Sequence, residues 1–156
     1  MNKILLIILT TSFFLCSTGC VFGQEKLLPE EMPADLNIVL TENGGANSFR
    51  SISIDAENIK FGSGSGWHSH KKTKREIPPH EVEKLYRVLQ ENQFDRIKGE
   101  SAYDFSPQVR NGSIMVFYNK KSIIVFDGSI PERNRERFER VWKAILETAE
   151  KYQTEN

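Results

Sequence analysis

Cysteine is nearly absent from this sequence. The chain has two, Cys16 and Cys20, and both lie within the first 20 residues. The rest of the chain therefore has no disulfide, no thiol nucleophile and no thiolate ligand for zinc. A domain formed by that part must be held together by its core alone.

Histidine is also scarce, and net charge is lacking altogether. The three histidines are His68, His70 and His80, and 21 basic side chains balance 21 acidic ones. The charge balance gives no indication of a nucleic-acid partner, and an exported protein is not expected to have one. We find no catalytic triad and no pair of acids with a telling spacing. The sequence therefore predicts a protein that is not an enzyme and has no cofactor.

The most apolar run is too short to cross a membrane as a helix, and it has the form of an export signal. Lys3 precedes an almost wholly apolar segment from Ile4 to Leu15, which matches the apolar centre of a signal peptide in length. Small residues follow it. We therefore expect residues 1–23 to be a signal peptide of a bacterial protein.

Two maturation routes fit these residues. Cleavage after Gly23 would start a soluble protein at Gln24 with a net charge of −1, because Lys3 is the only charge removed. Alternatively, Ser17 to Cys20 resembles a lipobox, in which Cys20 is lipidated and anchors the protein. Either route predicts a protein of the periplasm, the cell envelope or the exterior, with membrane contact only through Cys20.

Downstream of the signal, the sequence predicts a tether and one domain. Residues 24–35 are polar, contain two prolines and are expected to be a tether. Residues 36–153 are long enough for one domain with one core. Their order of elements is strands, a helix, two more strands and a second helix. Because helices do not alternate with every strand, we expect an α+β fold, an antiparallel sheet of about five to six strands with both helices on one face.

Alternating apolar and polar residues predict the first strands at 36–41 and 50–54. A third strand starts at Ile59 and is expected to end at Gly62, and residues 72–77 return as its hairpin partner.

Two later segments, 114–118 and 123–126, are apolar on both faces. This pattern predicts central strands rather than edges.

The two helices are predicted from their apolar stripes. Pro79 suits the first helical turn, and the apolar face that follows consists of Val82, Leu85, Tyr86 and Leu89. Ser129 and Glu132 have the spacing of a capping box before the second helix. The apolar stripe of that helix consists of Phe138, Val141, Trp142, Ile145, Ala149 and Tyr152. Its other face carries mixed charge, including Arg137 and Arg140, and is expected to be solvated.

The segment from Gly62 to His70 holds the candidate site residues. His68 and His70 would share one face of a strand and bind zinc or copper, with His80 as a further ligand. Lys71, Lys72, Lys74 and Arg75 disfavour a cation there. The alternatives are a polar hairpin tip with exposed histidines, or a contact loop anchored by Trp67, His68 and His70.

Several stretches of the domain together resemble a known family. They are Leu40–Gly45, Ile52–Asp55, Pro79–Leu85, Asn92–Phe94 and Phe117–Pro131. Their order and spacing over roughly residues 36–150 resemble emfourin, a small proteinaceous inhibitor of thermolysin-type metallopeptidases, and related small bacterial domains. The resemblance implies a non-enzymatic α+β binding domain with a peptidase as its target. The export signal and the Gly62–His70 segment depart from that family, and no inhibitory contact residue carries over.

The sequence thus predicts an exported, non-enzymatic domain that binds another protein, with a metallopeptidase as the specific candidate. One alternative is an envelope protein whose partner is not a protease. The other is a metal-binding protein that uses His68 and His70.

Overall fold

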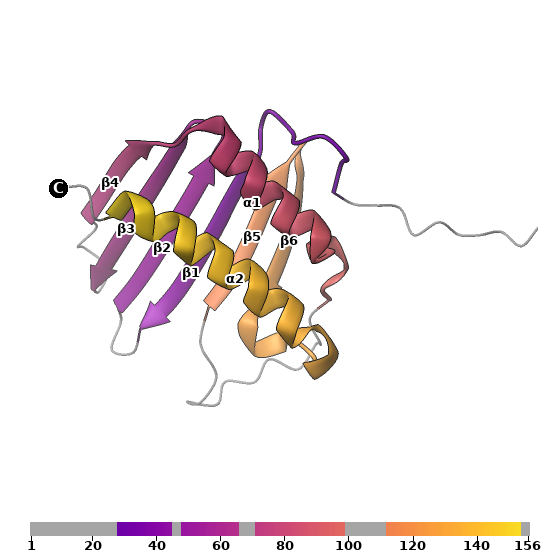
Figure 1. Cartoon of the computed structure of the whole chain (residues 1–156). Helices are drawn as coiled ribbons and strands as arrows, with labels where there is room; N and C mark the ends of the chain where they lie inside the picture. The colour runs from indigo at the N-terminus through magenta and orange to yellow at the C-terminus, as the bar shows by residue number, and fades with distance from the viewer. Residues whose placement is uncertain (1–27, 45–47, 66–70, 99–111, 154–156) are drawn as a thin grey trace, which may run out of the picture.

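The computed structural model describes residues 28–44, 48–65, 71–98 and 112–153. They form one antiparallel sheet with two helices across one of its faces (Figure 1). The six strands are β1 (Asn37–Gly44), β2 (Ser48–Asp55), β3 (Asn58–Ser65), β4 (Lys71–Glu76), β5 (Gly112–Tyr118) and β6 (Lys121–Phe126). The helices are α1 (Pro79–Glu91) and α2 (Glu132–Gln153), and the short 3-10 helices are η1 (Phe94–Arg96) and η2 (Asp127–Ser129). The predicted α+β class and the single layer of helices are confirmed.

The strands lie in the order β4-β3-β2-β1-β5-β6, and each neighbouring pair is antiparallel. Ile38 lies opposite Ile54 and Leu40 opposite Ile52, and all four side chains are fully buried. This alternation places one face of the sheet in the core. Strand β3 continues to Ser65 rather than ending at Gly62, which corrects the predicted boundary.

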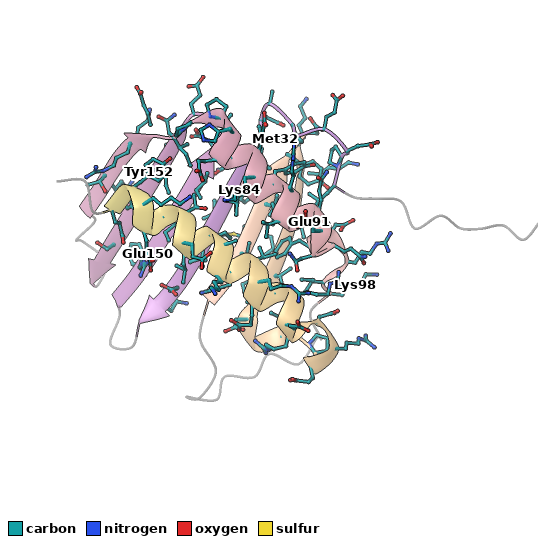
Figure 2. All side chains as sticks on the ribbon, viewed as in Figure 1. Met32, Lys84, Glu91, Lys98, Glu150 and Tyr152 are labelled. Carbon is teal, nitrogen blue, oxygen red and sulfur yellow. The ribbon has the colours of Figure 1, made fainter. Side chains whose placement is uncertain are left out.

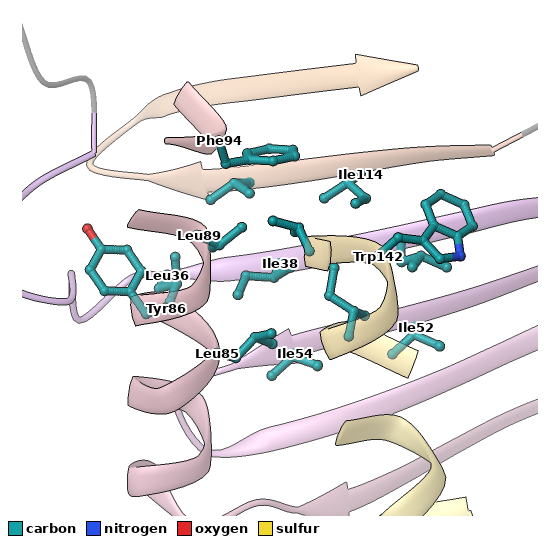
Figure 3. Close-up of a cluster of buried hydrophobic side chains, with 14 of the residues drawn as sticks. Leu36, Ile38, Ile52, Ile54, Leu85, Tyr86, Leu89, Phe94, Ile114 and Trp142 are labelled. Atoms are coloured by element: carbon teal, nitrogen blue, oxygen red, sulfur yellow. The ribbon is translucent and has the colours of Figure 1, made fainter. Parts of the chain in front are cut away.

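The helices pack on the sheet through the faces that their periodicity predicts. Val82, Leu85, Tyr86 and Leu89 of α1 are buried, and Pro79 starts that helix. The predicted stripe of α2 is buried from Phe138 to Ala149, and Tyr152 is partly buried against the same core. Figure 3 shows Trp142 reaching the sheet near Ile52 and Phe94 covering the β5 side.

The first turn of α2 differs from its prediction. The helix begins at Glu132, and Ser129 lies in η2, where its hydroxyl donates to the carbonyl of Phe126 at 2.9 Å. Ser129 is therefore not the N-cap of α2. Instead, Arg135 of the helix donates to the buried carboxylate of Asp127 and joins η2 to α2.

The predicted tether packs against the domain from Leu28 onward. Leu28 is buried in the core, and Met32 is packed against it (Figure 2). The carbonyl of Pro29 accepts hydrogen bonds from Tyr86 Oη at 2.7 Å and from Gln90 Nε2 at 2.6 Å. Residues 28–35 thus lie along α1 as part of the folded unit.

Two arginines of α2 hold the end of α1: Arg137 is partly buried against the prediction of a solvated face, while Arg140 is 53% exposed in agreement with it. Arg137 donates from Nε to the carbonyl of Asn92 and from Nη2 to that of Gln93, each at 2.7 Å. Arg140 Nε donates to Asn92 Oδ1, also at 2.7 Å. At the other end of the helix pair, Lys151 donates to Glu81 at 2.9 Å. Contacts at both ends show that α1 and α2 run antiparallel.

Candidate protein-binding surface

The sheet has a second face, and no described helix lies on it (Figure 1). Side chains that alternate with the core residues point there. Val39 of β1 lies opposite Met115 of β5, which lies opposite Ile124 of β6. Phe117 and Phe126 lie on the same face of β5 and β6. We name this set the outer patch: Val39, Met115, Phe117, Ile124 and Phe126.

The outer patch is unusually open to solvent for side chains of this size. Phe117 is 37% exposed, Ile124 48% and Phe126 44%, while Val39 and Met115 are partly buried beneath and beside them. Single exposed apolar residues are common on protein surfaces, but a contiguous group marks a site of interaction. The patch therefore has the composition of a protein-binding surface, in which Phe and Met are enriched.

The position of β6 overturns one sequence prediction. Residues 123–126 are apolar on both faces, which predicted a central strand, but β6 is the last strand of the sheet. Its core side is buried at Val125 and its other side is exposed at Ile124 and Phe126. The pattern places apolar side chains on both faces of the strand. It did not reveal that the described structure covers one face only.

Most of the other described side chains of this face are polar, with Phe49 of β2 as a partly buried apolar exception. Thr41 and Ser113 share a hydrogen bond of 2.8 Å between their hydroxyls, and Ser53 donates to Asn37 at 2.9 Å. Farther out, Lys60 of β3 and Lys74 of β4 lie opposite each other. The outer patch is therefore confined to the side of the sheet formed by β1, β5 and β6.

Asp55 is the most strongly organised charged group on this polar side. Burial by itself would raise the pKa of its carboxyl, but a hydrogen bond from Lys60 at 2.7 Å and others from Asn58 and the Glu57 amide lower that pKa to about 2. The carboxylate ties the β2–β3 turn together and has a structural role.

Of the sequence-predicted site residues, the described structure contains only His80. Cys20, Trp67, His68 and His70 lie outside the described residues. His80 lies in the first turn of α1 with its side chain 76% exposed, and its Nε2 is 3.9 Å from Glu81 Oε1. Within the described ranges, no group of three acids, histidines or cysteines is placed to hold a metal ion.

A hollow of about 260 Å³ lies where β2, β3 and β4 meet the end of α2. Arg50, Thr73, Arg75 and Tyr152 line it together with small residues of β2 and β3. Among the described residues of its lining there is no acid and no histidine. Of the two arginines in the lining, Arg50 has its Nη1 3.7 Å from Glu42 Oε2. Arg75 also interacts with other groups of the protein.

No helix in the described part of the chain is both long and apolar enough to cross a membrane. No model of a known protein family matches the sequence, and no curated protein matches it significantly.

Proposed function

We propose that this protein is an exported, non-enzymatic domain that binds another protein through the outer patch. The observation that supports this is the contiguous exposure of Phe117, Ile124 and Phe126 on a face that no described helix covers. Burying such a side chain from full exposure is worth about 1.5–3 kcal/mol, so covering the 37–48% that is still exposed stabilises a complex by roughly 1 kcal/mol for each side chain. A partner that covers all three gains a substantial part of a typical binding free energy.

A metallopeptidase is the specific partner that we propose. Its support is the resemblance of residues 36–150 to emfourin-like inhibitors, which bind a peptidase without acting on it. An envelope protein that is not a protease would be recognised by the same surface, because apolar contacts do not select for an enzyme.

Affinity capture tests the surface and the partner together. The exported protein is immobilised and exposed to the envelope fraction of its own cells, as wild type and as Phe117→Thr/Ile124→Thr. Threonine favours strands, so this variant removes apolar area with little effect on the sheet. The matched control is Lys72→Thr/Lys74→Thr, which changes exposed outer-face residues far from the patch.

We expect the wild type and the lysine control to capture the same partner and the patch variant to lose it. Inhibition of a thermolysin-type peptidase by the wild type alone would establish the peptidase as target. A partner retained by the patch variant would contradict the proposal, and a captured protein without peptidase activity would favour the envelope alternative.

A further inference from the structure

The main-chain groups on the open edge of β6 follow from the hairpin that it forms with β5. Asn119 and Lys120 form a two-residue turn with φ of 46° and 61°, and Tyr118 lies opposite Lys121. The two residues that flank such a turn are hydrogen-bonded to each other through their main chains. Along the two strands, hydrogen-bonded pairs then alternate with pairs that are not hydrogen-bonded. Lys121, Ile123 and Val125 therefore direct their N–H and C=O groups to β5. Ser122 and Ile124 direct theirs away from the sheet.

The two edge strands of the sheet differ in how well their sequences prevent them from pairing with a strand of another chain. Proteins block edge strands with charge, proline or a bulge. β4 has the sequence Lys-Lys-Thr-Lys-Arg-Glu, so its edge is densely charged. β6 has one charged residue, Lys121 beside the turn, and contains no proline. Its register with β5 runs without a bulge over the whole strand. Of the two edges formed by the described strands, that of β6 is thus the one without such protection in its own sequence.

On these observations, and resting on the proposed function, we propose that β6 is a strand-addition site for an extended segment of the partner protein. The added segment forms main-chain hydrogen bonds with the N–H and C=O groups of Ser122 and Ile124. It thereby extends the sheet by one strand. Main-chain hydrogen bonds provide affinity in this mode of recognition, and side chains beside the strand provide specificity.

A second copy of this chain fits the same edge less well. Two β6 strands joined in the plane of the sheet would meet along six residues each, a length of roughly 20 Å. At a sheet thickness of ~10 Å, such a contact covers about 200 Å², well short of the ~800 Å² per partner that a stable interface buries. It would also leave Phe117 and Met115, one strand away from the edge, uncovered. A partner that adds a strand and continues over the outer patch covers both surfaces at once.

The surroundings of β6 define the chemistry of the added segment. Ile124 and Phe126 flank it on the outer face, so every second residue of the segment is apolar. Lys120 and Lys121 are exposed at the turn end of β6. An acidic residue at that end of the segment complements their charge.

Random dodecapeptides displayed on phage and selected on the exported protein provide the probe. We expect the selected peptides to alternate apolar and polar residues and to carry an acid at one end. Affinity is then measured for Ser122→Pro, which removes an outward N–H, and for its matched control Ser122→Thr, which keeps it. Proline is tolerated on an edge strand where the N–H faces solvent, and thermal unfolding verifies that both variants fold.

Ser122→Pro should bind the selected peptide about tenfold more weakly than Ser122→Thr, as expected for the loss of one main-chain hydrogen bond. A second measurement does not depend on a protein variant. N-methylation of alternate peptide residues should abolish binding in one register and leave it unchanged in the other. Amide exchange at Ser122 and Ile124 should slow when the peptide is bound.

Several results would overturn the inference: no selected peptide, equal affinity for both Ser122 variants, or N-methylation without positional effect. Protection of the Ser122 and Ile124 amides in a dimer of the protein alone would assign the edge to a second copy. If capture of the natural partner needs Phe117 and Ile124 but is unaffected by Ser122→Pro, the proposed function stands and strand addition fails.

Discussion

At the scale of single residues, Gly112 shows how closely the core is packed. A Cβ at this position would lie 2.6 Å from the carbonyl oxygen of Thr41 and would collide with the ring of Trp142. Glycine is therefore required here for space.

We predict that Gly112→Ala lowers the free energy of unfolding by about 1–3 kcal/mol, the usual cost of overpacking. Denaturant unfolding measures this loss. In a double-mutant cycle, Trp142→Phe should relieve part of it by removing the larger ring. Strictly additive losses would show that the two residues do not compete for this space.

Asp55 gives a prediction about acid. Its pKa is about 2 in the folded protein, against 3.8 ordinarily. The interactions of the carboxylate therefore stabilise the fold fully above pH 3.8, and this stabilisation is lost as the pH falls toward 2. We predict that Asp55→Asn lowers stability by about 1–2 kcal/mol at neutral pH and flattens the decline below pH 3.8. Unfolding free energies measured against pH provide the comparison. Parallel curves for the two proteins would contradict it.

At the scale of elements, the pairing of the helices depends on the C-terminus of α1. The carbonyls of Asn92 and Gln93 lie at its negative end and accept two hydrogen bonds from Arg137. The N-terminus of α1 is held through Glu81, whose pKa is lowered, chiefly by the hydrogen bond from Lys151.

We predict that Arg137→Ala costs about 1–3 kcal/mol, because it leaves two carbonyls without their charged donor. Arg137→Lys should recover only part of this loss, since an ammonium does not reproduce the geometry of the guanidinium fork. The matched control is Arg133→Ala on the exposed face of the same helix. Equal stability of the two alanine variants, measured by denaturant unfolding, would contradict a role for Arg137 at the helix end.

At the scale of the whole molecule, the export proposal predicts the start of the mature protein. Intact-mass measurement of the protein from its native cells should find either Gln24 as the first residue or an acylated Cys20. A mature protein that retains residues 1–15 would disprove export by the Ile4–Leu15 segment.

Periodicity along the chain was sufficient to predict the order of elements, the buried faces of both helices and the α+β class. These depend on local spacing, and Val82, Leu85, Tyr86 and Leu89 are buried as their i, i+3, i+4, i+7 pattern indicates. The contacts of Arg137 with α1 were missed because they join residues 44 and 45 positions apart. Local charge patterning carries no signal for such a pairing.

The sequence by itself determined that residues 123–126 carry apolar side chains on both faces. Only the tertiary structure decided that β6 lies at the edge of the sheet, because strand order depends on pairing between distant segments. In this fold β1 pairs with both β2 and β5, and among the described strands β6 pairs with β5 alone. The apolar pattern of β6 therefore exceeds what the described core can bury, and the surplus forms the outer patch.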